Sequence, residues 1–121
     1  MNTYGLRGAI TVESNEREAI LSATRELLEA LIERNGLNEA DIVSCILSMT
    51  DDLNAEFPAV AAREMGLDKV PLLCVREIDV PGSMERVIRA LVHYRAPEGH
   101  EAQHVYLRDA QSLRSDISGA Q

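Results

Sequence analysis

The sequence predicts one domain of the α+β or α/β class, in which a single β-sheet is covered by two helices. The chain has 121 residues, which is the size of one ordinary domain. Apolar residues make up 45% of the chain and aromatic residues only 3%, so we expect a core of aliphatic side chains. Segments with strand-like and helix-like patterns alternate at first, and several strands follow. The domain is expected to span residues 1–121, with a flexible tail from about residue 115.

A strand and a long helix are predicted first. Residues 4–13 carry apolar side chains among glycines, which is typical of a strand in which Gly5 and Gly8 permit close approach of another backbone. Asn15, three residues before a glutamate, has the pattern of a helix N-cap. Apolar residues then recur at helical spacing until Gly36, which ends the predicted helix.

The next predicted elements are a second strand and a second helix. Residues 38–41 indicate a turn or a short helical segment. Residues 42–49 form a short apolar run, which is typical of a largely buried strand. Pro58 favours the first turn of a helix that continues to Met65 and ends at Gly66.

The C-terminal half is predicted to be mostly extended. Residues 70–75 indicate a third strand, and residues 81–83 indicate a turn. Residues 84–94 are compatible with a helix or with a buried strand, and their periodicity does not decide between the two. A loop, a short strand at residues 104–107 and a helical turn at residues 110–114 complete the prediction.

The charge and cysteine patterns argue against several classes of function. Asp and Glu number 20 against 12 Lys and Arg, and the resulting charge of -8 disfavours nucleic acid or an anionic membrane as a partner. No stretch approaches the ~18 apolar residues that span a bilayer, and no signal sequence is recognisable, so we expect a cytoplasmic location. Cys45, Cys74 and the three histidines lack metal-site spacing, so no metal is expected. Each cysteine is most simply a small buried hydrophobe.

Several side chains are suited to binding a small polyanion. Guanidinium groups stand out in an acidic chain, and together with a carboxylate, a thiol and a phenol they can bind carboxylates and hydroxyls and stabilise developing negative charge. The glycines near the N-terminus lack the spacing of phosphate-binding loops, and no motif for covalent catalysis is recognisable. We therefore predict an enzyme that acts on a small polyanion. The residues concerned are Arg7, Arg63, Arg89, Arg114, Glu77, Cys74 and Tyr106.

Five motifs follow one another along the chain: Arg7-Gly8-Ala9-Ile10-Thr11-Val12-Glu13, Phe57-Pro58-Ala59, Val70-Pro71-Leu72-Leu73-Cys74, Gly82-Ser83 to Arg89, and His104-Val105-Tyr106-Leu107. They occur in the same order in one known family, the monofunctional AroH-type chorismate mutases, which the chain resembles from about residue 4 to residue 117. The resemblance implies a Claisen rearrangement of chorismate to prephenate in phenylalanine and tyrosine biosynthesis, without metal or organic cofactor. It implies an α+β fold with a mixed sheet, in a homotrimer whose sheets pack into a central barrel and whose active sites lie between subunits. It also implies a strand around Arg89.

The resemblance further implies roles for individual residues. Three of them form the catalytic group: Arg89 at the breaking ether oxygen, Arg7 on a substrate carboxylate, and Glu77 as acceptor of a hydrogen bond from the ring hydroxyl. Tyr106 would donate its phenolic hydrogen to a carboxylate, and Cys74 would lie beside the ring hydroxyl. The other substrate-binding residues implied are Phe57, Ala59 and Leu73 as apolar wall, Leu113, and Arg63 with Arg114 at the mouth.

Three positions depart from the family pattern. Val60 stands where some members carry a lysine, Gln103 where arginine often precedes the His-Val-Tyr string, and Ser115 where proline often follows the Leu-Arg pair. These departures affect the expected capture of substrate and the order of the tail. They leave the residues of the catalytic group unchanged.

Simpler interpretations of the same residues are also open. Arg7 is alternatively an exposed strand arginine, Glu77 a surface carboxylate, and Tyr106 a half-buried strand tyrosine. Arg63 is alternatively a helix C-terminal cation that complements the helix dipole. The alternative function is a non-catalytic trimeric module that binds a small polyanion. The presence of Arg89 together with Arg7 disfavours this alternative, because binding alone needs no cation at an ether oxygen.

Overall fold

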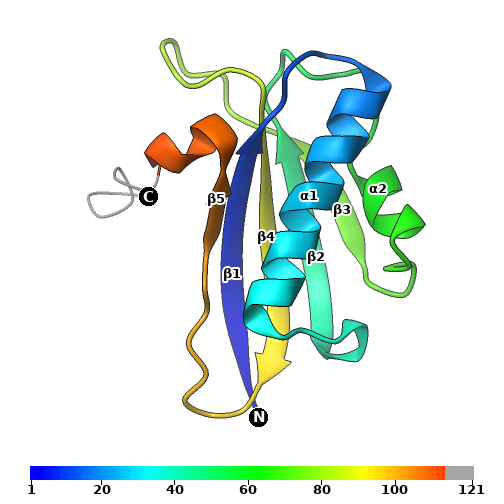
Figure 1. Ribbon diagram of the computed structural model, residues 1–121, viewed down its shortest axis with the longest axis vertical. Helices are drawn as coiled ribbons and strands as arrows, with labels where there is room; N and C mark the ends of the chain where they lie inside the picture. Colours follow the sequence, from blue (N-terminus) through cyan, green and yellow to red (C-terminus); the bar gives the residue numbers. More distant parts are fainter. Residues whose placement is uncertain (114–121) are drawn as a thin grey trace.

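A computed structural model describes residues 1–113, which form one five-stranded mixed sheet with two α-helices on one of its faces (Figure 1). The predicted sheet with two covering helices is confirmed, and the fold is α+β. The helices are α1 (Arg17–Asn35) and α2 (Ala59–Glu64), and the strands are β1 (Asn2–Thr11), β2 (Ile42–Met49), β3 (Leu72–Arg76), β4 (Val87–Ala96) and β5 (Val105–Leu107). A 3-10 segment, η1 (Glu39–Asp41), precedes β2, and a second one, η2 (Arg108–Ser112), follows β5.

The sheet has the strand order β3-β2-β4-β1-β5. Strand β4 is central and runs antiparallel to both β1 and β2, whereas the edge strands β3 and β5 run parallel to β2 and β1. The strand around Arg89 that the resemblance implied is therefore confirmed. In the register of the sheet, Arg89 lies between Ala9 of β1 and Ser48 of β2.

The core lies between the sheet and the helices. Alternate side chains of each strand face α1 and α2, as the two-residue period of a strand requires. At Gly8 the helix packs directly on the strand, because a Cβ there would lie 2.9 Å from Leu27 Cδ1 and 3.1 Å from Leu31 Cδ1. Gly8 thus permits the close approach of leucine side chains rather than of another backbone, and the prediction of close approach is wrong at Gly5, where a Cβ would meet no atom within 4 Å. Fully buried core residues include Leu6, Ile10, Ile20, Leu27, Leu31, Leu47, Ile88 and Tyr94.

The two ends of α1 differ in how well they were predicted. Gly36 ends the helix with a φ of 61°, and the N–H of Leu37 donates to the carbonyl of Ile32 at 3.0 Å, as predicted. The predicted cap at Asn15 is wrong, because Glu16 precedes the helix and no side chain caps it. The side-chain oxygen of Asn15 instead accepts hydrogen bonds from a loop that is distant in the sequence.

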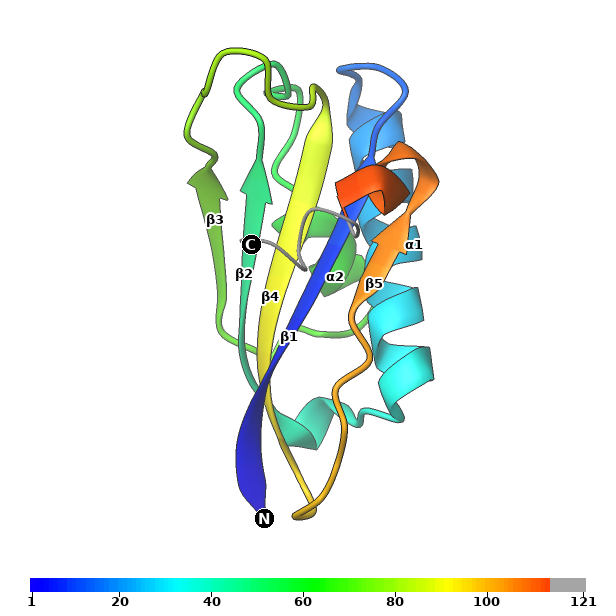
Figure 2. The ribbon, with the colours of Figure 1, turned by 90° about the vertical axis from the view of Figure 1, so that its left-hand side faces the viewer.

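The second face of the sheet is not covered by α1 or α2 (Figure 2). The prediction of a largely buried second strand therefore holds for one side only: Cys45 and Leu47 are buried, whereas Ile46 and Ser48 on the uncovered face are only half-buried. Among residues 1–113, no helix combines the length and the apolar character needed to cross a membrane.

Candidate active site

A first group of predicted residues gathers on the uncovered face of the sheet. Arg7 from β1, Arg89 from β4 and Tyr106 from β5 line one pocket of about 270 Å³. Strand register explains this arrangement, because Ala9 pairs with Arg89 on one side and with Tyr106 on the other. Arg7 is two residues from Ala9 and therefore points to the same face. The structure thus brings together three residues that are far apart in the sequence.

Glu77 joins this group through an ion pair. Its N–H donates to the carbonyl of Met49 at 2.9 Å, which brings Glu77 from the end of β3 towards Ser48. The Oε2 atom of Glu77 lies 3.0 Å from Nε of Arg89 and also accepts a hydrogen bond from the hydroxyl of Ser48. Ser48 was not identified from the sequence, because its proximity to Glu77 and Arg89 depends on strand register.

The Nε atom of Arg89 has an unusual environment. It is buried, and despite its proximity to Glu77 it makes no well-directed hydrogen bond with any atom of residues 1–113. The charge of Glu77 nevertheless stabilises the guanidinium at this distance. The side chain of Arg89 is about one-third exposed and lines the first pocket, so the guanidinium is placed to interact with an anionic ligand.

His104 contacts the backbone of Arg7 and was also missed as a site residue. Its Nδ1 atom accepts a hydrogen bond from the N–H of Arg7 at 3.0 Å, so a neutral ring carries its proton on Nε2. Partial burial lowers the pKa of His104, and the positive charge of Arg7 lowers it further. The shift keeps the imidazole neutral, which preserves the acceptor. Its position in the His-Val-Tyr-Leu motif is the sequence signal that could have identified it, but the motif does not show that His104 contacts Arg7.

A second group of predicted residues lies elsewhere in the chain. These residues line a pocket of about 430 Å³ next to α2 and the edge strand β3, and none of them lines the first pocket. Cys74, predicted to lie beside the same substrate hydroxyl as Glu77, belongs to this second group. The ring of Phe57 is 66% exposed and Leu73 is 57% exposed, which is unusual for large apolar side chains. The group consists of Phe57, Ala59, Arg63, Leu73 and Cys74.

The cysteines and the C-terminal residues complete the comparison with the predicted site. Cys45 is buried, and burial raises its pKa to about 12, so its prediction as a small buried hydrophobe is confirmed. Leu113 is half-buried and packs on the cluster around Ala9 that Tyr106 also contacts. Arg114 and the tail predicted from about residue 115 lie outside the described residues. Within residues 1–113, no group of three or more histidine, cysteine or acidic side chains is arranged to hold a metal ion.

Comparisons with known proteins agree in one family. The model of the family "chorismate mutase type I" matches residues 3–117. The chain is 48% identical to chorismate mutase AroH of Thermus thermophilus over 97% of this chain and 98% of the relative. It is 44% identical to chorismate mutase AroH of Bacillus subtilis over 98% of this chain and 94% of the relative.

A solved structure supports the same assignment. The chain superposes on a chorismate mutase from Clostridium thermocellum with a TM-score of 0.88 at 45% sequence identity, and the match covers 91% of this chain and 99% of that one. The family that the five motifs indicated is therefore confirmed. The chain belongs to the type I chorismate mutases, isomerases of aromatic amino acid biosynthesis.

Proposed function

We propose that this chain rearranges chorismate to prephenate at active sites shared between neighbouring subunits of a homotrimer. The observation that carries the proposal is the separation of the predicted site residues into two groups within one chain. The first group supplies cations, a carboxylate and a phenol, and the second supplies apolar surface and a thiol. In a closed ring of subunits, the first group of one chain would face the second group of its neighbour.

The first group supports the chemistry of a Claisen rearrangement. In this intramolecular step the ether C–O bond breaks while a new C–C bond forms, so neither a nucleophile nor a general base is needed. The ether oxygen becomes more negative in the transition state, and a cation placed there stabilises the transition state more than the substrate. We assign this role to Arg89, which lines the first pocket and whose Nε is held 3.0 Å from the carboxylate of Glu77.

The neighbours of Arg89 would orient the substrate. Arg7 and Tyr106 line the same pocket and would bind a substrate carboxylate by charge-assisted hydrogen bonds. Glu77 would accept the hydrogen bond from the ring hydroxyl while its charge keeps Arg89 in place. No step of this scheme requires a metal or an organic cofactor.

The second group would close the site from the neighbouring subunit. Phe57, Ala59 and Leu73 would form its apolar wall, and Cys74 would contact the ring hydroxyl. Arg63 would approach the substrate anion at the mouth, together with Arg114. The exposure of Phe57 and Leu73 in one chain supports this arrangement, because large exposed apolar side chains are typical of interaction surfaces.

The expected compartment of this reaction is the cytoplasm. Cys45 and Cys74 are both free thiols, which suits a reducing compartment.

Replacement of Arg89 tests the proposed mechanism. Arg89→Ala is expected to lower kcat by roughly 10²- to 10³-fold, the size typical for the loss of a preorganised donor in a charge-developing site. Arg89→Lys should fall between the parent and Arg89→Ala, because a point charge does not reproduce the guanidinium geometry. The measurement is the loss of chorismate absorbance, with sedimentation and circular dichroism as checks of assembly and folding.

A matched control is Arg34→Ala, which removes an exposed arginine from the last turn of α1. This variant should retain the parent rate. A folded Arg89→Ala variant with the activity of the parent would overturn the assignment of Arg89 to the ether oxygen.

A further inference from the structure

The loop that leads from β2 to Phe57 is held by a side chain from the start of α1. The Oδ1 atom of Asn15 accepts hydrogen bonds from the N–H groups of Asn54 at 2.9 Å and Ala55 at 3.0 Å. The amide nitrogen of Asn15 donates to Oδ1 of Asn54 at 2.8 Å. Three hydrogen bonds from one side chain thus fix two consecutive residues of the loop, in place of the backbone partners that a helix or strand would supply.

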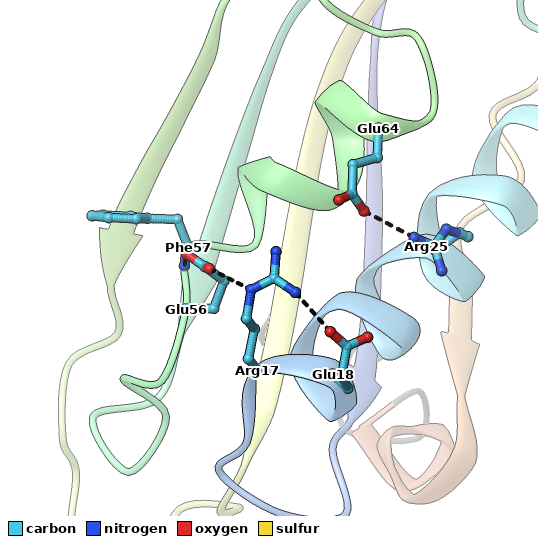
Figure 3. Close-up of polar contacts among 6 residues, drawn as sticks. All are labelled: Arg17, Glu18, Arg25, Glu56, Phe57 and Glu64. Carbon is cyan, nitrogen blue, oxygen red and sulfur yellow. Dashed lines mark hydrogen bonds and ion pairs between the residues drawn. The ribbon is translucent and has the colours of Figure 1, made fainter.

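A second contact holds the same loop one residue before Phe57. Oε1 of Glu56 accepts a hydrogen bond from the N–H of Phe57 at 2.8 Å, and Oε2 lies 3.0 Å from Nε of Arg17 (Figure 3). The Phe57 N–H bond and the charge of Arg17 lower the pKa of Glu56, which favours the ionised carboxylate. The exposed ion pair contributes little energy by itself. Its consequence is geometric, because it sets the direction of the backbone at Phe57.

The ring of Phe57 is directed away from Arg17 and α1, as Figure 3 shows. The ring is largely exposed, so the core of its own chain does not determine where it lies. Its position therefore depends on the backbone of the loop. A side chain presented in this way contributes more to binding when that backbone is already ordered before the ligand arrives, because binding then carries no further cost of ordering the loop.

We propose that Asn15 is a positioning residue for the reaction, which fixes the loop of residues 53–57 and so presents Phe57 to the active site of the neighbouring subunit. The Glu56 carboxylate, held by Arg17, assists Asn15 in this role. The proposal rests on the proposed function, because it takes Phe57 as part of the substrate wall. It also explains why Asn15 is not the N-cap of α1: its side chain is occupied by the loop.

Steady-state kinetics of three asparagine variants test the proposal. Asn15→Ala is expected to raise KM for chorismate about fivefold while kcat changes by less than about twofold, because a wall residue binds substrate and transition state alike. Asn15→Asp keeps the oxygen that accepts both loop N–H groups, so it should restore a KM close to the parent. Asn38→Ala removes an exposed asparagine that makes no capping bond at η1, and it should leave KM unchanged.

A double variant separates positioning from a general effect on stability. If Asn15 acts through Phe57, then Asn15→Ala should add nothing to the KM of Phe57→Ala, because there is no ring left to position. Glu56→Ala removes the acceptor of the Phe57 N–H and should raise KM in the same direction. It provides the same test if Asn15→Ala does not assemble.

Three results would overturn the proposal: a parent-like KM in Asn15→Ala, a parent-like KM in Phe57→Ala, or additive effects in the double variant. The Arg89→Ala variant distinguishes failure of the positioning role from failure of the proposed mechanism. If the proposed mechanism is wrong, Arg89→Ala keeps the activity of the parent. If only the positioning role is wrong, Arg89→Ala still loses activity.

Discussion

Arg89 shows how strand partners place a functional side chain. Its partners across the sheet are Ala9 and Ser48, whose small side chains leave space above the sheet for the guanidinium. Glu77 reaches the same point because its N–H continues the pairing of β3 with β2 through the carbonyl of Met49. Both charged residues were identified from the sequence, Arg89 within a motif and Glu77 through the resemblance to the family. Their ion pair, and the hydrogen bond from Ser48, depend on the register of three strands.

His104 leads to a prediction about stability and pH. Its pKa in the folded chain lies below the value of about 6.5 in the unfolded chain, so the unfolded state binds more protons as the pH falls through this range. The folded state therefore loses stability below about pH 6.5 and loses none from this group above it. His104→Asn offers a similar acceptor to the N–H of Arg7 without titrating. In urea unfolding at one protein concentration, the free energy of unfolding should decrease less between pH 7.5 and pH 5.5 for His104→Asn than for the parent. Equal decreases would contradict the assignment of this pH dependence to His104.

At the scale of elements, the packing of α1 on β1 depends on Gly8. Leu27 and Leu31 come within 2.9 to 3.1 Å of the place where a Cβ would stand, and both leucines are buried in a packed core. Two side chains that cannot move outwards would have to change rotamer or push the helix away from the sheet.

Gly8→Ala should therefore destabilise the protein by ~1–3 kcal/mol. Gly5→Ala is the matched control on the same strand, because a Cβ there meets no atom within 4 Å. Thermal and urea unfolding of both variants provide the comparison. If Gly8→Ala were as stable as Gly5→Ala, the close contact of helix and strand would not limit stability.

The elements themselves were predicted to different degrees. Residues 42–49 coincide with β2, because a short apolar run between turn residues is a local signal. The segment at residues 84–94 stayed ambiguous from its periodicity, since β4 is buried on one face and half-buried on the other. The cap at Asn15 failed for a different reason: a loop about forty residues away in the sequence competes for its side chain.

At the scale of the whole molecule, the separation of the site residues predicts that neither group works alone. Arg89→Ala inactivates the first group, and a variant with both Phe57→Ala and Arg63→Ala is expected to inactivate the second. If sites lie between subunits, mixed trimers contain interfaces at which an intact first group meets an intact second group.

Random mixing of the two variants in equal amounts should restore about one quarter of the parent activity, because half of the chains carry each intact group. The measurement is chorismate turnover after the two variants are unfolded and refolded together, compared with each variant refolded separately. Activity that only equals the mean of the separate samples would place each site within one chain.

The family, one sheet with two helices, and the chemical groups available to the reaction could all be predicted from the residues alone. These properties follow from local patterns and from motifs whose spacing is visible along the chain. Which groups lie together emerged from the folded chain: Ser48 lies beside Glu77, His104 beside Arg7, and Asn15 beside the loop before Phe57. Strand register and long-range side-chain contacts depend on burial and pairing across the whole chain, and no local pattern specifies them.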